Sequence, residues 1–130
     1  MQYVVIMILL LVLTSGPVHA EWVLISKAQA EPATYIDSDT IRRKGNMVRW
    51  WQLLDYKTVQ TMADISYLSV KIQMEFDCAE EQIRALALSQ FSGNMGSGEV
   101  VFSNFTKDEW EPVQPGSRGH TLWKVACRKQ

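Results

Sequence analysis

Cysteine and histidine, the side chains that most often ligate metals or act as nucleophile and base, are scarce in this sequence. The chain has two cysteines, Cys78 and Cys127, and two histidines, His19 and His120. Neither cysteine belongs to a CxxC pair, and the other ligands that a zinc site would need are scarce. A Ser-His-Asp triad or a Cys–His pair would depend on His120 alone, because His19 lies in a segment that we expect to be removed. We therefore expect no metal, no cofactor and no catalytic residue.

Carboxylates are the other candidates for catalysis. Asp37 and Asp39 lie in the segment YIDSDTIRRKG, and Glu80 and Glu81 follow the first cysteine. A glycoside hydrolase needs two carboxyl groups that face each other across a cleft, with one of them kept protonated. Neighbouring acids in turn sequences more often solvate a loop or cap a short helical turn. The pattern therefore favours a protein that is not an enzyme.

Two other groupings suggest anion binding, and we interpret both as structural. The stretch SGNMGSG, residues 92–98, precedes an expected strand, whereas a phosphate-binding loop opens a helix. Its glycines favour a turn with positive φ angles. Arg42, Arg43 and Lys44 form a small basic cluster that is more typical of a solvated turn than of an anion site.

The first twenty residues have the pattern of a secretory signal peptide. Val4–Leu13 is an unbroken apolar run, Gly16 and Pro17 then end any helix, and Val18 and Ala20 place small residues before a cleavage site. No Lys or Arg precedes the run, and the alternative is an uncleaved anchor, for which the run is short. We predict a signal peptide at residues 1–20 and a single domain at residues 21–130.

The expected mature domain is nearly neutral and has an even number of cysteines. The chain has 13 basic and 14 acidic side chains, so its net charge indicates no nucleic-acid partner. A small exported domain often adds a disulfide to a thin core, and we predict one between Cys78 and Cys127. The alternatives are two free thiols or half of a metal site.

Alternating apolar and polar residues predict an antiparallel sheet. Tyr67–Cys78 alternates throughout, which indicates a strand with one dry and one wet face, and Met47–Lys57 repeats the pattern more loosely. The segment VQTMADI between them, residues 59–65, is long enough for a hairpin connection. Four further strands are predicted at Trp22–Lys27, Ala33–Ile36, Arg84–Phe91 and Glu99–Phe105.

The ending HTLWKVACRKQ has helical rather than alternating spacing. Leu122, Trp123, Ala126 and Cys127 share one face, and cations follow near the end, where the helix dipole favours them. We predict an α+β fold of about six strands, mainly antiparallel, with a short C-terminal helix tied to it by the disulfide.

Two adjacent tryptophans, Trp50 and Trp51, are the candidate partner-binding residues. Neighbours on a strand point to opposite faces, so one ring enters the core. The other is either exposed as an anchor for a partner or covered by another element.

Taken in order, several segments resemble the surface-adhesin protein E family of proteobacteria. They are an opening Trp22, YID with its IRRKG turn, VRWWQLLDY, the strand ending in Phe76-Asp77-Cys78, FSGNMGSGEVV, Trp110-Glu111-Pro112, PGS and a terminal Trp-x-x-x-Cys. The resemblance covers essentially all of residues 21–130. It implies an exported bacterial protein, an antiparallel sheet with a C-terminal helix, a Cys78–Cys127 disulfide, dimerisation, and attachment to host extracellular-matrix and serum proteins.

These inferences lead to a non-catalytic binding module of the cell envelope that recognises a protein partner. A bacterial lipoprotein would carry cysteine directly after the cleavage site, where this chain has Glu21. We therefore expect no stable membrane anchor after cleavage and a periplasmic or secreted location rather than surface display. The alternative is a periplasmic inhibitor of a hydrolase such as lysozyme, with SGNMGSG or EPVQPGSRG as the loop that enters the enzyme cleft.

Overall fold

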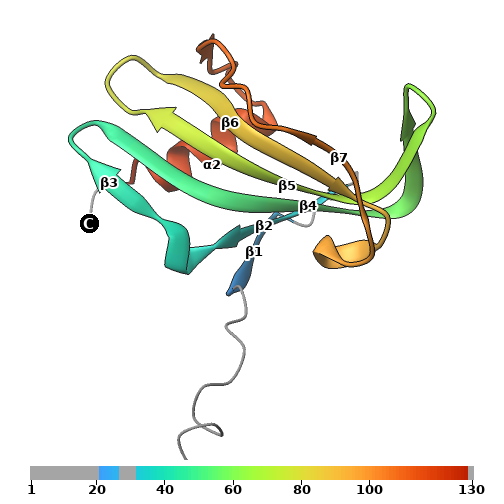
Figure 1. The fold of residues 1–130 in the computed structure, drawn as a ribbon. Helices are drawn as coiled ribbons and strands as arrows, with labels where there is room; N and C mark the ends of the chain where they lie inside the picture. The colour runs from blue at the N-terminus through green and yellow to red at the C-terminus, as the bar shows by residue number, and fades with distance from the viewer. Residues whose placement is uncertain (1–20, 27–31, 129–130) are drawn as a thin grey trace, which may run out of the picture.

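The computed structural model describes residues 21–26 and 32–128, and it consists of an antiparallel sheet with a C-terminal helix (Figure 1). The expected signal peptide, residues 1–20, lies outside the described residues, as does Lys27 at the end of the first predicted strand. The strands are β1 (Trp22–Ser26), β2 (Ala33–Asp37), β3 (Arg42–Lys44), β4 (Met47–Met62), β5 (Ile65–Asp77), β6 (Gln82–Phe91), β7 (Val100–Asn104) and β8 (Glu111–Pro112). The helices are η1 (Ser38–Thr40), η2 (Asn94–Gly96) and α2 (Arg118–Ala126).

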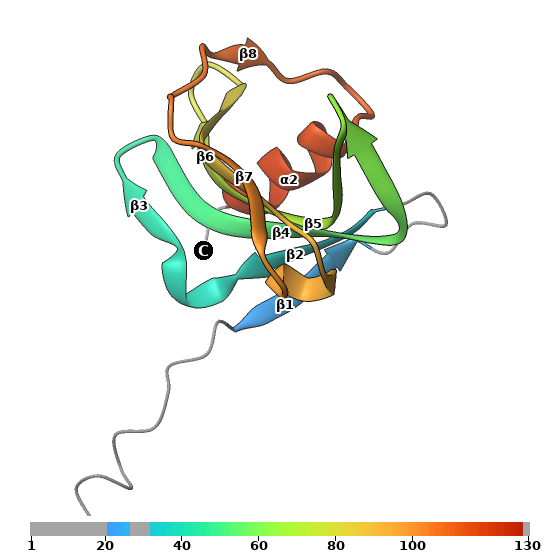
Figure 2. The same cartoon turned by 45° about the vertical axis from the view of Figure 1, so that its right-hand side comes forward.

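The strands form one twisted sheet whose order confirms the predicted fold class (Figure 2). Neighbours follow the order β1-β2-β4-β5-β6-β7, and these six correspond to the six predicted strands. Two short strands were not predicted: β3, which pairs with β4, and β8, which pairs with β6. Their three and two residues are too few to show an alternating pattern, and every residue in them is exposed.

The hairpin between β4 and β5 corrects one prediction. The strand predicted to end at Lys57 continues to Met62, and β5 begins at Ile65, so residues 59–65 are not a loop. The turn is Ala63 and Asp64, with φ angles of 49° and 67°, as in the tight turns that match strand twist. The pairing register shifts between Asp55 and Gln60, which explains why the period-two pattern fades there.

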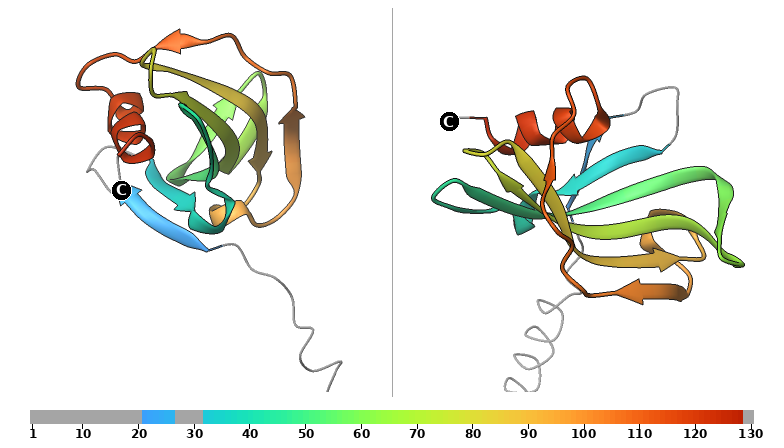
Figure 3. Two further views of the ribbon diagram at one scale, coloured as in Figure 1. Left: turned by 90° about the vertical axis from the view of Figure 1, so that its left-hand side faces the viewer. Right: turned by 90° about the horizontal axis from the view of Figure 1, so that it is seen from above.

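Helix α2 packs on one face of the sheet, which we call the helix face, and the main core lies between them (Figure 3). The Trp50 and Phe76 ring centroids are 4.5 Å apart, and Leu122 and Ala126 of α2 are buried against this cluster. The helix begins two residues before the predicted segment, because the Ser117 side chain accepts a hydrogen bond from the His120 N–H at 3.1 Å.

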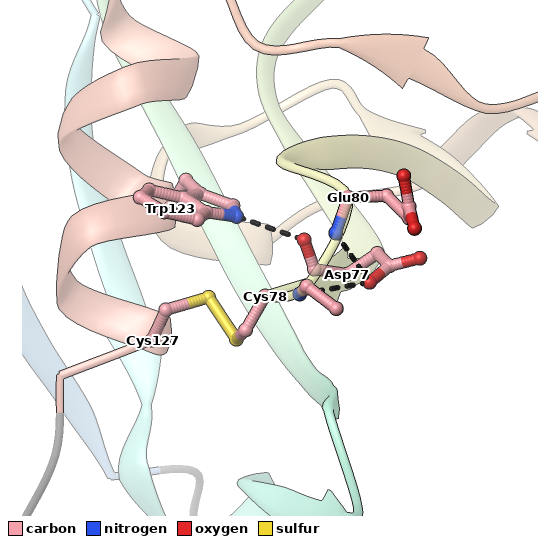
Figure 4. Close-up of a disulfide and its surroundings, with 6 residues drawn as sticks. Asp77, Cys78, Glu80, Trp123 and Cys127 are labelled. Atoms are coloured by element: carbon pink, nitrogen blue, oxygen red, sulfur yellow. Dashed lines mark hydrogen bonds between the residues drawn. A yellow bond between two sulfur atoms is a disulfide. The ribbon is translucent and has the colours of Figure 1, made fainter.

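The Cys78–Cys127 disulfide, which confirms the predicted pairing, fixes the end of α2 to the end of β5 (Figure 4). The two Cα atoms are 5.5 Å apart. Beside the bridge, Trp123 Nε1 donates to the Asp77 carbonyl oxygen at 3.0 Å. The Asp77 carboxylate accepts from the Ala79 and Glu80 N–H groups, which closes the turn into β6.

Candidate functional site

The two adjacent tryptophans lie on opposite faces of β4, as the alternation requires. Trp50 is 1% exposed in the core, and its Nε1 donates to Gln52 Oε1 at 2.9 Å. Trp51 is half-buried on the face away from α2. Its ring is therefore the only one of the pair that a partner can reach without a rearrangement of the core.

Trp51 belongs to a face that carries two further tryptophans, Trp22 of β1 and Trp110 of the segment before β8; we call it the tryptophan face. Lys71 of β5 lies between two of the rings. Its Nζ is 5.8 Å from the Trp22 ring centroid and 5.9 Å from that of Trp51. Both distances are within cation–π range, so the Lys71 ammonium group of β5 interacts with the Trp22 ring of β1 and the Trp51 ring of β4.

A buried carboxylate with two arginines lies next to these rings. Glu75 is 3% exposed, and its two oxygens accept from Arg49 Nε at 2.7 Å and from Arg84 Nε at 2.7 Å. The Arg84 guanidinium carbon is 4.1 Å from the Trp110 ring centroid. Glu75 of β5 thereby links β4 to β6 through the two arginines, and Arg84 extends the contact to the segment before β8.

The charge of Glu75 is maintained by these two arginines. Burial of the carboxyl group raises its pKa, because the charged form loses water. The hydrogen bonds and Coulomb attraction of Arg49 and Arg84 outweigh that effect and hold the pKa of Glu75 below its ordinary value. The group is thus an ionised structural anion, whereas a general acid at neutral pH would need a raised pKa.

A cavity of about 430 Å³ opens on this face between β3, β4 and β5. Three cations and one carboxylate line it together with polar and apolar groups: Thr40, Arg42, Lys44, Met47, Arg49, Gln73 and Glu75. The basic cluster that we interpreted as a solvated turn is therefore strand β3, and two of its three side chains face this cavity.

The SGNMGSG segment folds onto the tryptophan face. Ser69 Oγ donates to the Gly93 carbonyl oxygen at 2.7 Å and accepts from the Gly96 N–H at 2.9 Å. The Met95 N–H donates to the Asp55 carboxylate at 2.8 Å. Positive φ angles at Gly96 and Gly98 agree with the predicted turn. These hydrogen bonds tie the segment to β4 and β5, while Met95 at its centre stays exposed.

Residues considered for catalysis serve local structure. Asp37 caps η1 by accepting from the Asp39 N–H at 3.2 Å. His120 Nδ1 accepts from the Gly116 N–H at 3.1 Å, and the imidazole stacks on Trp123. Within residues 21–26 and 32–128, no three or more His, Cys, Asp or Glu side chains are grouped so as to hold a metal ion. No helix in the same ranges has the length and apolar character needed to cross a membrane.

The sequence pattern gave Trp50 and Trp51 as candidates but did not indicate most of the residues that lie around Trp51. Glu75 and Lys71 fall on the polar side of the alternating β5 pattern, where solvent exposure was expected. The one usable signal was the placement of Arg49 and Arg84 on the polar sides of adjacent predicted strands, since opposite charges pair across strands. The register that brings them to Glu75 is visible only in the structure.

Comparison with known proteins agrees with this architecture. The family model for surface-adhesin protein E matches residues 22–128, and the chain belongs to this family. Two crystal structures of Haemophilus influenzae protein E, one described as crystal form II and one as a selenomethionine form, each superpose with a TM-score of 0.62 at 14% identity. Both alignments cover 85% of this chain, and they cover 90% and 88% of the other chain.

A third structure, protein E from non-typeable Haemophilus influenzae, gives a TM-score of 0.56 at 15% identity, with 85% of this chain and 78% of that chain covered. Among curated proteins, none matches the sequence. The structural likeness shows a shared fold. The family match supports an adhesin-like binding module.

Proposed function

We propose that this chain is an exported, non-catalytic, adhesin-like module that binds a protein partner through the tryptophan face around Trp51. The observation that carries the proposal is the Trp22–Lys71–Trp51 arrangement beside the Arg49–Glu75–Arg84 group. Tryptophan and arginine dominate the binding energy of protein interfaces when they are rigidly held and partly buried. Membership of the surface-adhesin protein E family supports the same class of function.

The rings and cations of this face are already ordered without a partner. Trp51 is half-buried, its backbone N–H donates to Thr40 Oγ1 at 2.9 Å, and Lys71 lies over its ring. An ordered side chain loses little conformational entropy on binding, which favours its use as an anchor.

The proposal includes a location and an assembly. Residues 21–130 would act as one domain after removal of residues 1–20, in the periplasm or outside the cell rather than displayed through a lipid anchor. We also propose a homodimer. Mass spectrometry of the purified protein tests cleavage before Glu21, and analytical ultracentrifugation tests the dimer.

Capture from bacterial envelope extract and from host matrix and serum proteins tests the binding face. Trp51→Ala is expected to reduce the captured partner roughly tenfold, because it removes an interface anchor. Phe105→Ala is the matched control, since Phe105 is 71% exposed and belongs to the segment after β7. Equal capture by wild type and Trp51→Ala, with both folded by circular dichroism, would reject this face.

A hydrolase inhibitor is the second candidate, and one observation favours keeping it. The segment Gln114–Gly116 is exposed between β8 and α2, so one of the two predicted cleft-entering loops is accessible. Lysozyme assays with added protein test it directly. Loss of lysozyme activity that is restored by replacing Gln114–Gly116 supports inhibition, and unchanged activity at micromolar concentration removes it.

A further inference from the structure

The cavity beside Trp51 has the charge of an anion site. Arg42, Lys44 and Arg49 line it, and the single carboxylate in its lining, Glu75, is already shared between Arg49 and Arg84. The whole chain is nearly neutral, with 13 basic and 14 acidic side chains, so this excess of positive charge is a local property of the tryptophan face. A small hollow lined by one sign of charge attracts the opposite charge.

We propose that this cavity is the subsite that receives the carboxylates of an acidic segment of the protein partner. The inference rests on the proposed function and names the chemistry of the partner: a peptide segment rich in Asp or Glu that lies across β3, β4 and β5, with an acidic side chain in the cavity and its neighbours against Trp51.

Arg49 is the central group of this subsite. Its Nε donates to Glu75 Oε2 at 2.7 Å, and this bond fixes the plane of the guanidinium group. The terminal nitrogens of Arg49 make no hydrogen bond to any residue in the described part of the chain, and its side chain is 49% exposed. A held guanidinium with unused donors is suited to carboxylate recognition, because a carboxylate can accept two parallel N–H bonds.

Lys44 and Arg42 supply the other two charges from β3. Arg42 is held at the rim by its own Nη1, which donates to the Asp39 and Ile41 carbonyl oxygens at 2.9 Å each. Lys44 is exposed and forms no ion pair with any described residue. The cavity therefore combines two oriented guanidinium groups with one adaptable ammonium group.

A peptide fits this face better than a sugar polymer does. Sugars bind tryptophan by stacking on the ring faces, and here the rings of Trp22 and Trp51 lie around Lys71 while that of Trp110 lies against Arg84. Each of these rings thus already has a cation near it, which leaves less free ring surface for a sugar to stack on. A volume of about 430 Å³ is also sufficient for one acidic side chain and its backbone.

A fluorescein-labelled oligoglutamate peptide, titrated against the folded domain at low salt, tests the subsite. Wild type is expected to bind, with affinity that falls as salt is added. Lys44→Gln is expected to weaken binding about threefold, the size expected for one exposed charge pair. Arg49→Gln is expected to weaken binding about tenfold, because it removes a charge-assisted donor pair. Lys124→Gln on α2 is the matched control and is expected to bind as wild type does.

The Lys44→Gln variant keeps the test valid if Arg49→Gln is poorly folded, since Lys44 has no ion pair in the described structure to lose. Absence of oligoglutamate binding, or equal losses in Lys44→Gln and Lys124→Gln, would overturn the proposal. So would binding of a sulfated glycan but not of oligoglutamate. If partner capture depends on Trp51 but not on Lys44 and Arg49, the proposed function stands and the acidic-segment inference fails.

Discussion

At the residue scale, Glu75 is the buried group that joins Arg49 of β4 to Arg84 of β6 across β5. It is 3% exposed on the side of β5 where the sequence pattern suggests solvent, and both its oxygens are paired with arginine. Arg84 has a side chain that is 18% exposed, so it is also partly removed from water. A buried ion pair adds little net stability compared with apolar residues, but removal of one partner leaves a costly unpaired charge.

Glu75→Gln is therefore expected to lower the free energy of unfolding by roughly 2–3 kcal/mol, near the low end for a buried pair because Arg49 is half exposed. Urea unfolding followed by tryptophan fluorescence measures the change. Glu99→Gln is the control, because Glu99 is exposed and makes no ion pair within the described residues, and it should stay within about 0.5 kcal/mol of wild type. Equal midpoints for Glu75→Gln and wild type would contradict this role.

The difference in unfolding free energy between wild type and Glu75→Gln is expected to depend on pH. Because the pKa of Glu75 is lower in the folded than in the unfolded state, the folded state binds fewer protons there. Its contribution to stability is complete above the unfolded pKa and is lost as pH falls through the folded pKa. The stability difference between wild type and Glu75→Gln should thus shrink in acid. A difference that grows on acidification would show that the sign is wrong.

At the element scale, the disulfide links the end of the central strand β5 to the end of the C-terminal helix α2. It joins residues 49 positions apart, and the covalent loop that it closes contains β6, β7, β8 and α2. The helix is nine residues long, too short to be stable alone, and depends on Leu122 and Ala126 packing against the sheet.

Removal of the bridge in a Cys78→Ser, Cys127→Ser double variant is expected to lower the free energy of unfolding by roughly 4 kcal/mol, from the entropy of closing a loop of this length. Chemical denaturation with and without reductant measures it, and reduced wild type should match the double variant. Unchanged stability after complete reduction, checked by thiol titration, would contradict the expected contribution.

The elements also show how far sequence reasoning reaches. Alternation identified the six strands of the main sheet order, because strands with one dry face keep a period of two. It could not identify β3 and β8, whose few residues are all exposed, nor the true end of β4, where the register shifts.

Less of the candidate site than of the fold could be predicted from the sequence. The alternation placed Trp50 and Trp51 on opposite faces, but it did not show which of the two rings is buried. Lys71 reaches Trp22, from a strand 49 positions earlier, only through the order β1-β2-β4-β5. Alternation assigns a side chain to a face, but it does not show which distant residues cover that face.

At the scale of the whole molecule, the two faces of the sheet are covered by different elements. On the helix face, α2 packs over one end of the sheet, with Trp50 and Phe76 in the core beneath it (Figure 3). Its exposed side chains Arg118, Thr121 and Lys124 are polar. The tryptophan face carries three tryptophan rings, cations and a cavity, and η2 and the segment with Trp110 lie over parts of it. Partner binding is expected on the second face.

Site-specific photo-crosslinking tests this division most directly. A benzoylphenylalanine is placed at Gln73, which lines the cavity beside Trp51, or at Thr121, which is exposed on α2. Each labelled protein is irradiated in bacterial envelope extract and, separately, with host matrix and serum proteins. We expect a covalent adduct from position 73 that disappears with Trp51→Ala, and none from position 121. An adduct from position 121 alone would contradict the assignment of the tryptophan face as the binding surface.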